Sequence, residues 1–187
     1  GLLMVTPPLD KSFYEKRSRD VTYIIDTSGS MGGESIAQAK QALRKALTRL
    51  SIADTFNIIA FNSTANSLFN KSVPATTEAI DEADEFIAGL EAYGGTEMMP
   101  ALEMALGSAD EGLNGRLQQI VFMTDGAVEQ EEKLFQLIHN QLGERRLFTV
   151  AIGSAPNAYF MRKAAQFGRG SYTFIGDTQE VSEKMDQ

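Results

Sequence analysis

Three oxygen-bearing side chains are spaced two residues apart early in the chain. They are Asp26, Ser28 and Ser30, with Thr27 and Gly29 between them. Alternate residues of an extended or turning segment can point the same way, so the three side chains can converge on one small cation. Carboxylate and hydroxyl oxygens are hard ligands of the kind that bind Mg²⁺ or Ca²⁺. The segment therefore predicts a divalent-cation site.

Two later residues fit the same chemistry. Thr96 follows Gly94 and Gly95, in a loop flexible enough to bring its hydroxyl close, and Asp125 follows the apolar run 120–123 with one residue between them. Mg²⁺ demands near-octahedral oxygens at about 2.0 to 2.1 Å and usually keeps some waters, so we predict Mg²⁺, with Mn²⁺ and Ca²⁺ as alternatives. Because three of the five ligands are neutral hydroxyls, the metal stays electrophilic and keeps an open position for an external anion.

A simpler interpretation exists for the first segment alone. Asp and Ser often bond to their own backbone in turns, and Gly29 supplies unusual dihedral angles there. Thr96 and Asp125 decide between the two interpretations, because each follows a predicted strand or a glycine pair in the order that a shared site requires. The five residues together favour metal binding over turn formation.

Short apolar runs alternate with amphipathic segments along most of the chain. The continuous runs are typical of strands buried on both faces of a parallel sheet, and the segments between them repeat apolar residues at three- and four-residue steps, as helices do. The expected strands are 21–25, 55–61, 120–123, 147–152 and 171–175, with a hairpin partner near 67–69 after the polar turn 62–64. The expected helices are 35–50, a stretch after Thr77, a stretch from near Pro100, 131–142, 157–167 and a last helix opened by a capping box of Asp177 and Glu180.

This alternation predicts the α/β class. We expect an open, doubly wound, mostly parallel sheet with helices on both faces and one short antiparallel edge strand. Ligands of such sheets bind at the carboxyl ends of the strands, which is where the candidate metal ligands stand. Residues 1–18, which include Pro7-Pro8, are expected to be an extended lead-in from a preceding domain, and residues 19–187 to be one domain of a longer, multidomain protein.

The five candidate ligands resemble the metal-ion-dependent adhesion site of von Willebrand factor type A domains. The resemblance lies in Asp26-x-Ser28-x-Ser30, in Thr96 after two glycines and in Thr124-Asp125-Gly126, and all five ligand positions are present. It implies a Rossmann-like fold in which the serines and the threonine ligate metal directly, while the aspartates bind it directly or through water. The stretch 19–31 is also similar to the inter-α-trypsin inhibitor heavy-chain-like members of the family.

The composition excludes several classes of partner. The 187 residues are 43% hydrophobic and 22% charged, carry a net charge of −8 and include no cysteine. A negative chain opposes binding to nucleic acid and to anionic lipid surfaces. No apolar run approaches the roughly 20 residues that span a bilayer, so no membrane insertion is expected. The absence of cysteine rules out a disulfide, a thiolate metal site and a cysteine nucleophile.

Other residues of chemical interest have ordinary interpretations. His139 has no cysteine or second histidine to complete a zinc or catalytic site, so we expect a structural role. The acidic group Glu129, Glu131 and Glu132 favours a solvated helix start. Met98 and Met99 are consistent both with core packing and with an adaptable binding surface.

Three functions are compatible with these observations. The first is a non-enzymatic adhesion or assembly module, extracellular or on the cell surface, in which a partner protein supplies an Asp or Glu carboxylate to the metal. The second is a Mg²⁺-dependent phosphate-handling enzyme, which is disfavoured because Ser28 stands where haloacid-dehalogenase-like phosphatases need a second acid, and because no GxxxxGK[ST] loop occurs. The third is an intracellular assembly or chaperone-like protein with the same metal site.

Overall fold

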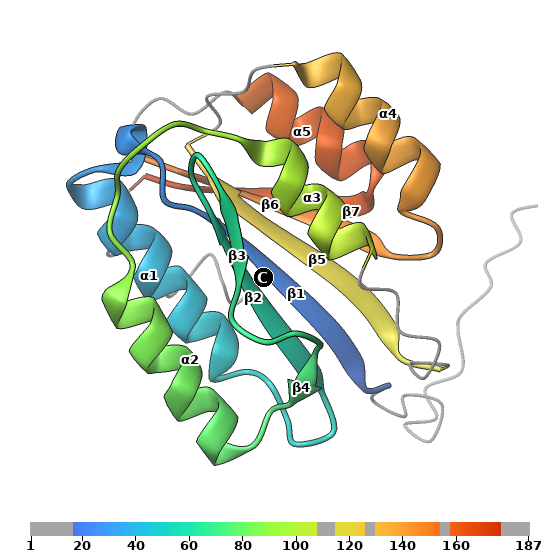
Figure 1. The fold of residues 1–187 in the computed structure, drawn as a ribbon. Helices are drawn as coiled ribbons and strands as arrows, with labels where there is room; N and C mark the ends of the chain where they lie inside the picture. Colours follow the sequence, from blue (N-terminus) through green and yellow to red (C-terminus); the bar gives the residue numbers. More distant parts are fainter. Residues whose placement is uncertain (1–16, 108–114, 126–129, 154–157, 177–187) are drawn as a thin grey trace, which may run out of the picture.

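A seven-stranded sheet forms the centre of the computed structural model, which describes residues 17–107, 115–125, 130–153 and 158–176. The strand order is β3-β2-β1-β5-β6-β7, with β4 also paired to β2 (Figure 1). Strands β1, β2, β5, β6 and β7 are mutually parallel, whereas β3 and β4 run antiparallel to β2. The strands are β1 (Arg19–Asp26), β2 (Thr55–Phe61), β3 (Ala65–Ser67), β4 (Val73–Pro74), β5 (Leu117–Thr124), β6 (Arg146–Ile152) and β7 (Arg169–Ile175).

Helices cover both faces of this sheet. Helices α1 (Glu34–Leu47) and α2 (Thr77–Gly89) lie on one face, and α3 (Met98–Gly107), α4 (Glu131–Gln141) and α5 (Ala158–Phe167) lie on the other (Figure 1). A short 3-10 turn, η2 (Gly29–Met31), connects β1 to α1. The predicted doubly wound, mostly parallel α/β architecture is therefore confirmed.

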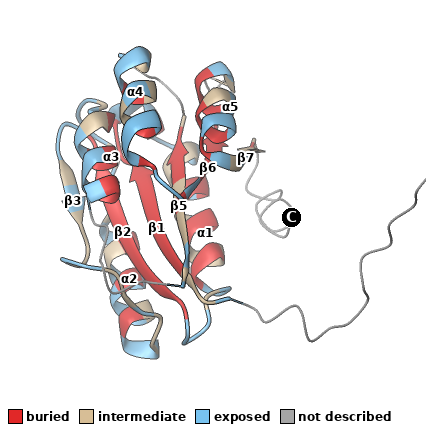
Figure 2. Cartoon of the chain, turned by 90° about the vertical axis from the view of Figure 1, so that its right-hand side faces the viewer, coloured by how far each residue is buried: buried red, intermediate tan, exposed pale blue. Residues whose placement is uncertain are grey.

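Two hydrophobic cores lie on opposite sides of the sheet. Tyr23 and Ile25 point into the core under α1 and α2, while Ile24 between them points into the core under α3, α4 and α5. A strand buried on both faces carries apolar side chains on both, which explains the consecutive apolar residues 23–25 in β1. Figure 2 shows β1 and β2 as buried along most of their length.

The predicted hairpin forms, but its second strand is Ala65–Ser67 rather than a strand near 67–69. The side chain of Asn57 explains the difference, because it binds the backbone of Phe69 at both polar groups. Its Oδ1 accepts from the Phe69 amide at 3.1 Å, and its Nδ2 donates to the Phe69 carbonyl at 2.8 Å. These bonds replace strand pairing at that point.

Other boundaries shift by a few residues. Helix α1 ends at Leu47 rather than at residue 50, because the Arg49 and Leu50 amides bond to carbonyls three residues back, at Ala46 and Leu47. Strand β4 was not predicted, and α3 begins at Met98, before Pro100. Residues 1–16 of the predicted 1–18 lead-in and the predicted last helix, within 177–187, lie outside the described residues, whereas Arg19 and Asp20 already belong to β1.

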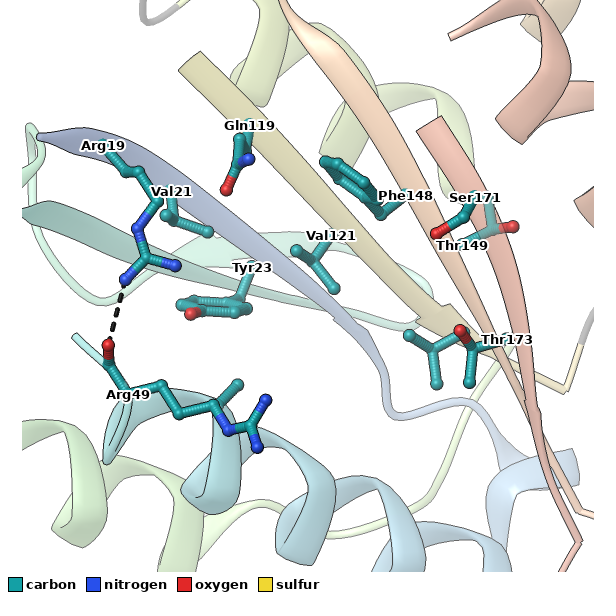
Figure 3. Close-up of a pocket in the computed structure, with 12 residues that line it drawn as sticks. Arg19, Val21, Tyr23, Arg49, Gln119, Val121, Phe148, Thr149, Ser171 and Thr173 are labelled. Carbon is teal, nitrogen blue, oxygen red and sulfur yellow. Dashed lines mark hydrogen bonds between the residues drawn. The ribbon is translucent and has the colours of Figure 1, made fainter. Parts of the chain in front are cut away.

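A groove of about 260 Å³ lies on the α1 side of the sheet, toward the amino ends of the strands. Its walls include Val21, Val121 and Phe148, and Arg19 donates to the Arg49 carbonyl at one end at 2.9 Å (Figure 3). The groove is at the opposite end of the strands from the residues that carry the predicted metal chemistry. None of the helices among the described residues is long and apolar enough to cross a membrane.

Candidate metal centre

The end of β1 turns sharply and brings two serines together. Asp26 is fully buried, and its Oδ1 accepts a hydrogen bond from the Ser28 amide at 2.8 Å. This bond closes a tight turn, after which η2 begins, with Met31 fully buried beneath it. As a result, Ser28 Oγ and Ser30 Oγ lie 3.1 Å apart.

The spacing of these hydroxyls fits a small divalent cation. Neighbouring ligands of an octahedral Mg²⁺, with bonds of about 2.1 Å, lie about 3 Å from each other. The Ser28 and Ser30 oxygens have this separation and are neutral, hard donors. The donor set present in the fold therefore fits the expected metal.

The second oxygen of Asp26 is held from the neighbouring strand. Thr124, at the end of β5, donates its hydroxyl to Asp26 Oδ2 at 2.5 Å, and both residues are fully buried. Each carboxylate oxygen still has a further lone pair, so Asp26 can also face a cation or a metal-bound water. Thr124 had no predicted role of its own, although it is the residue directly before Asp125.

The electrostatics of the site favour a cation. Burial raises the pKa of Asp26 above its usual value, hydrogen bonds from Thr124 and Ser28 lower it in part, and the negative charge of Asp125 raises it further. Asp125 itself is half-buried directly after β5. A cation beside Asp26 and Asp125 would offset the negative charge of these carboxylates.

Thr96 reaches the site through the backbone of its loop. The Tyr93 amide donates to the Thr27 carbonyl at 2.9 Å, and the Gly29 amide donates to the Gly94 carbonyl at 3.1 Å. The loop that carries Thr96 is thus bonded directly to the segment that carries Asp26, Ser28 and Ser30. The sequence analysis treated this glycine-containing loop as flexible, whereas the structure holds it with hydrogen bonds.

Thr96 is also close to the start of α4, on the other side of the site. It lines a small cavity of about 20 Å³ together with Gln130 and Leu134. Helix α4 follows Asp125 after the undescribed residues 126–129. The fold therefore brings Asp26, Ser28 and Ser30 into contact, attaches the Thr96 loop to them and places the charge of Asp125 near Asp26.

The remaining candidates that the structure describes lie on α3 and α4. His139 is exposed on α4, and Met98 is buried in the core, whereas Met99 is half-buried and lines the small cavity with Thr96. Glu131 and Glu132 are in the first turn of α4, and Glu129 lies outside the described residues. Within the described ranges, no three His, Cys, Asp or Glu side chains gather in a way that could hold a metal, so a cation site here depends on hydroxyl oxygens.

Comparison with known proteins is consistent with this geometry. A family model described as the von Willebrand factor type A domain matches residues 19–174. Human inter-alpha-trypsin inhibitor heavy chain H4 is 34% identical over 79% of this chain and 17% of its own length. This chain spans about a fifth of the length of the curated relatives that it matches.

Solved structures share the fold. A von Willebrand factor type A structure from Catenulispora acidiphila has a TM-score of 0.81 at 23% identity and covers 90% of this chain and 41% of its own. Proximal thread matrix protein 1 from the mussel byssus, described with a zinc-occupied MIDAS motif, has a TM-score of 0.69 at 14% identity over 91% of this chain and 46% of its own.

Proposed function

Because this chain belongs to the von Willebrand factor type A domain family, we propose that it is a non-enzymatic protein-binding module with a divalent metal at the carboxyl ends of its central strands. The family is known for metal-dependent protein binding. The proposed metal ligands are Asp26, Ser28, Ser30, Thr96 and Asp125. The observation that carries the proposal is the pair of serine hydroxyls 3.1 Å apart beside a fully buried carboxylate.

The residues of the site define what the partner must supply. Ser28, Ser30 and Thr96 contribute no charge, so only two carboxylates offset a divalent cation. A bound Mg²⁺, Mn²⁺ or Ca²⁺ supplies a Lewis acid with an open coordination position. Asp26 is held on both oxygens by Ser28 and Thr124, so it keeps one orientation. We propose that the partner donates an Asp or Glu carboxylate, which completes both the charge balance and the coordination.

The alternatives have less support. A haloacid-dehalogenase-like phosphatase needs a second acid two residues after its nucleophile, and Ser28 occupies that place with its hydroxyl against Ser30. Likeness to inter-α-trypsin inhibitor heavy chains favours an extracellular or cell-surface role over intracellular assembly. Immunoblotting of washed cells and medium for the native protein, with the cytosol as the third fraction, separates these two locations.

Thermal unfolding with and without metal tests the site. We expect excess Mg²⁺ or Mn²⁺ to stabilise the wild type against an EDTA reference by about 2.7 kcal/mol at 100 times the dissociation constant. Ser28→Ala should lose this increment, whereas Ser171→Ala, at an exposed position on β7, should keep it. A wild type that gains nothing from any divalent cation, with calorimetry also showing no binding, contradicts the proposal.

Partner chemistry is tested by NMR titration of the Mg²⁺-loaded protein. The probes are short capped peptides that contain one Asp, and the control peptides contain Asn in its place. We expect amide shifts around Ser28 and Thr96 with the Asp peptides only, and their loss on addition of EDTA. Equal shifts with Asp and Asn peptides would mean that the partner is not recognised through a carboxylate.

A further inference from the structure

The loop that carries Thr96 is anchored on both sides of that residue. The amide of Gly95 donates to Ser63 Oγ at 2.8 Å, and the amide of Glu97 donates to the Asn62 carbonyl at 2.7 Å. Both acceptors belong to one short turn between β2 and β3. Thr96 therefore lies between two residues whose amides are hydrogen-bonded to a turn about 33 residues earlier in the sequence.

The two glycines before Thr96 fit tightly against this turn. Gly94 has φ of +77°, and a Cβ added there would lie 2.9 Å from Ser63 Oγ. A Cβ added at Gly95 would lie 3.3 Å from the same oxygen. A positive φ and a close approach both require glycine, so the glycine pair lets the loop contact the Ser63 hydroxyl.

The turn is itself attached to the strand end that carries the serines. The Asn62 amide donates to the Thr64 carbonyl at 2.9 Å, which closes the turn. Just before it, the Phe61 carbonyl accepts from the Thr27 amide at 2.7 Å and from the Thr27 hydroxyl at 2.9 Å. Since Thr27 lies between Asp26 and Ser28, the turn has a fixed position relative to the proposed metal ligands.

We infer that Ser63 is a positioning residue for Thr96 in the proposed metal centre. Its hydroxyl accepts from the amide of Gly95, the residue before Thr96, and thereby holds the threonine hydroxyl where it can face Ser28 and Ser30. Ser63 itself does not bind the metal. This inference rests on the proposed function, since it concerns the geometry of the same site. It also makes the Thr96 side of the site preformed, so that the loop needs no rearrangement to receive a cation.

The expected effect is on metal affinity. One backbone hydrogen bond at an exposed position is worth a roughly threefold to tenfold change in an equilibrium constant. In Ser63→Ala, the dissociation constant for Mn²⁺, measured by EPR and checked with Mg²⁺ by calorimetry, should rise by about that factor. Hydrogen exchange of the Gly95 amide in the metal-free protein should accelerate in the same variant.

Two further variants separate positioning from general stability. Ser63→Thr keeps the hydroxyl, so it should restore the affinity. Ser67→Ala removes a hydroxyl from the same hairpin, where it accepts from Asn57 at 2.9 Å, but makes no contact with the Thr96 loop. It should lower the unfolding temperature while leaving the Mn²⁺ affinity unchanged.

The outcomes distinguish this inference from the proposed function. A wild type that binds no divalent metal overturns the proposed function and the positioning role with it. A wild type that binds, together with an unchanged Mn²⁺ affinity in Ser63→Ala, overturns the positioning role alone. An equal loss of affinity in Ser67→Ala also overturns it, because the effect would then come from hairpin stability.

Discussion

Thr124 holds Asp26 from the neighbouring strand, and this contact ties the two strand ends of the site together. The hydrogen bond is short and fully buried, and its acceptor is a carboxylate that is shielded from solvent. Hydrogen bonds to a charged acceptor contribute about 1.5 to 3 kcal/mol, more than neutral ones. At the residue scale, Thr124 therefore orients the carboxylate and lowers the cost of its burial.

Replacing Thr124 by valine tests this role with little change in volume. We expect Thr124→Val to lower the free energy of unfolding by about 2 kcal/mol in EDTA, because Asp26 Oδ2 loses its donor. Metal affinity should also fall, since the carboxylate loses its fixed orientation. Thr124→Ser keeps the donor and should retain the affinity. Urea titrations and Mn²⁺ binding measure both quantities, and identical affinities in the valine and serine variants would argue against the role.

Local spacing predicted the candidate residues of the site, but not the contacts that hold them. Asp26, Ser28 and Ser30 are candidates because their spacing alone can bring their oxygens together. Thr124 belongs to a motif of the sequence but had no predicted role, and no local spacing predicts its contact or that of Ser63, since these act across 98 and 32 residues. The glycine pair at 94 and 95 predicted a loop, but its cause, the closeness of Ser63, is visible only in three dimensions.

At the scale of elements, one partly buried ion pair connects the first residue of β1 to the loop between α1 and β2. Arg19 Nη2 lies 2.9 Å from Asp54 Oδ2, and the Arg19 amide donates to Asp54 Oδ1 at 2.7 Å. Ser51 donates to Asp54 Oδ2 from its amide at 2.9 Å and from its hydroxyl at 3.0 Å. Asp54 thereby fixes where the parallel pair of β1 and β2 begins.

This carboxylate should make stability depend on pH. Burial disfavours its ionised form, but the hydrogen bonds from Arg19 and Ser51 outweigh burial and hold the pKa of Asp54 well below its usual range. A depressed folded-state pKa contributes stability above the unfolded value of about 3.9 and loses it as pH falls through the folded value. Asp54→Asn should thus cost about 2 to 3 kcal/mol near neutral pH, and the difference from wild type should shrink steadily below about pH 4.

The exposed pair between Arg44 and Asp84 provides the control. It joins α1 to α2, and its side chains are 43% and 56% exposed, so solvent screens it. Asp84→Asn should change the free energy of unfolding by less than about 1 kcal/mol. Chemical denaturation at a series of pH values compares the two variants. A similar cost for both substitutions would mean that Asp54 contributes no more than a surface charge.

Several elements with a regular burial pattern were predicted to within one residue, among them β2, α4 and α5. Strand β2 has the predicted bounds, because all seven of its residues are buried and five of them are apolar. Strand β4 has two residues, one half-buried and one exposed, and it includes a proline, so no apolar pattern marks it. The spacing of apolar residues along a sequence reflects which residues are buried. It therefore fails to predict a strand that is short, that lies at the edge of the sheet, or whose pairing is altered by a side chain such as Asn57.

At the scale of the whole molecule, the site works against the stability of the metal-free fold. The chain carries a net charge of −8, and a fully buried Asp26 with Asp125 nearby adds negative charge where solvent cannot screen it. Functional sites commonly keep such unfavourable groups because binding compensates for them. The metal-free and metal-bound proteins should therefore respond oppositely to removal of this charge.

Asp26→Asn tests this opposition with an isosteric change. The Asn carbonyl oxygen can still accept from the Ser28 amide, and its NH₂ group can donate to the Thr124 hydroxyl, so both observed contacts persist in form. In EDTA, we expect this variant to be more stable than wild type by about 1 kcal/mol, since a buried charge beside Asp125 is removed. With excess Mg²⁺, the wild type should become the more stable of the two, because the variant lacks the carboxylate that the cation needs.

Asp26→Ala, which removes both contacts, should be less stable than wild type in either condition. Calorimetric unfolding of the three proteins with and without Mg²⁺ makes the comparison, and an Asn variant that is destabilised in EDTA would show that the Asp26 charge stabilises the fold rather than serving the metal.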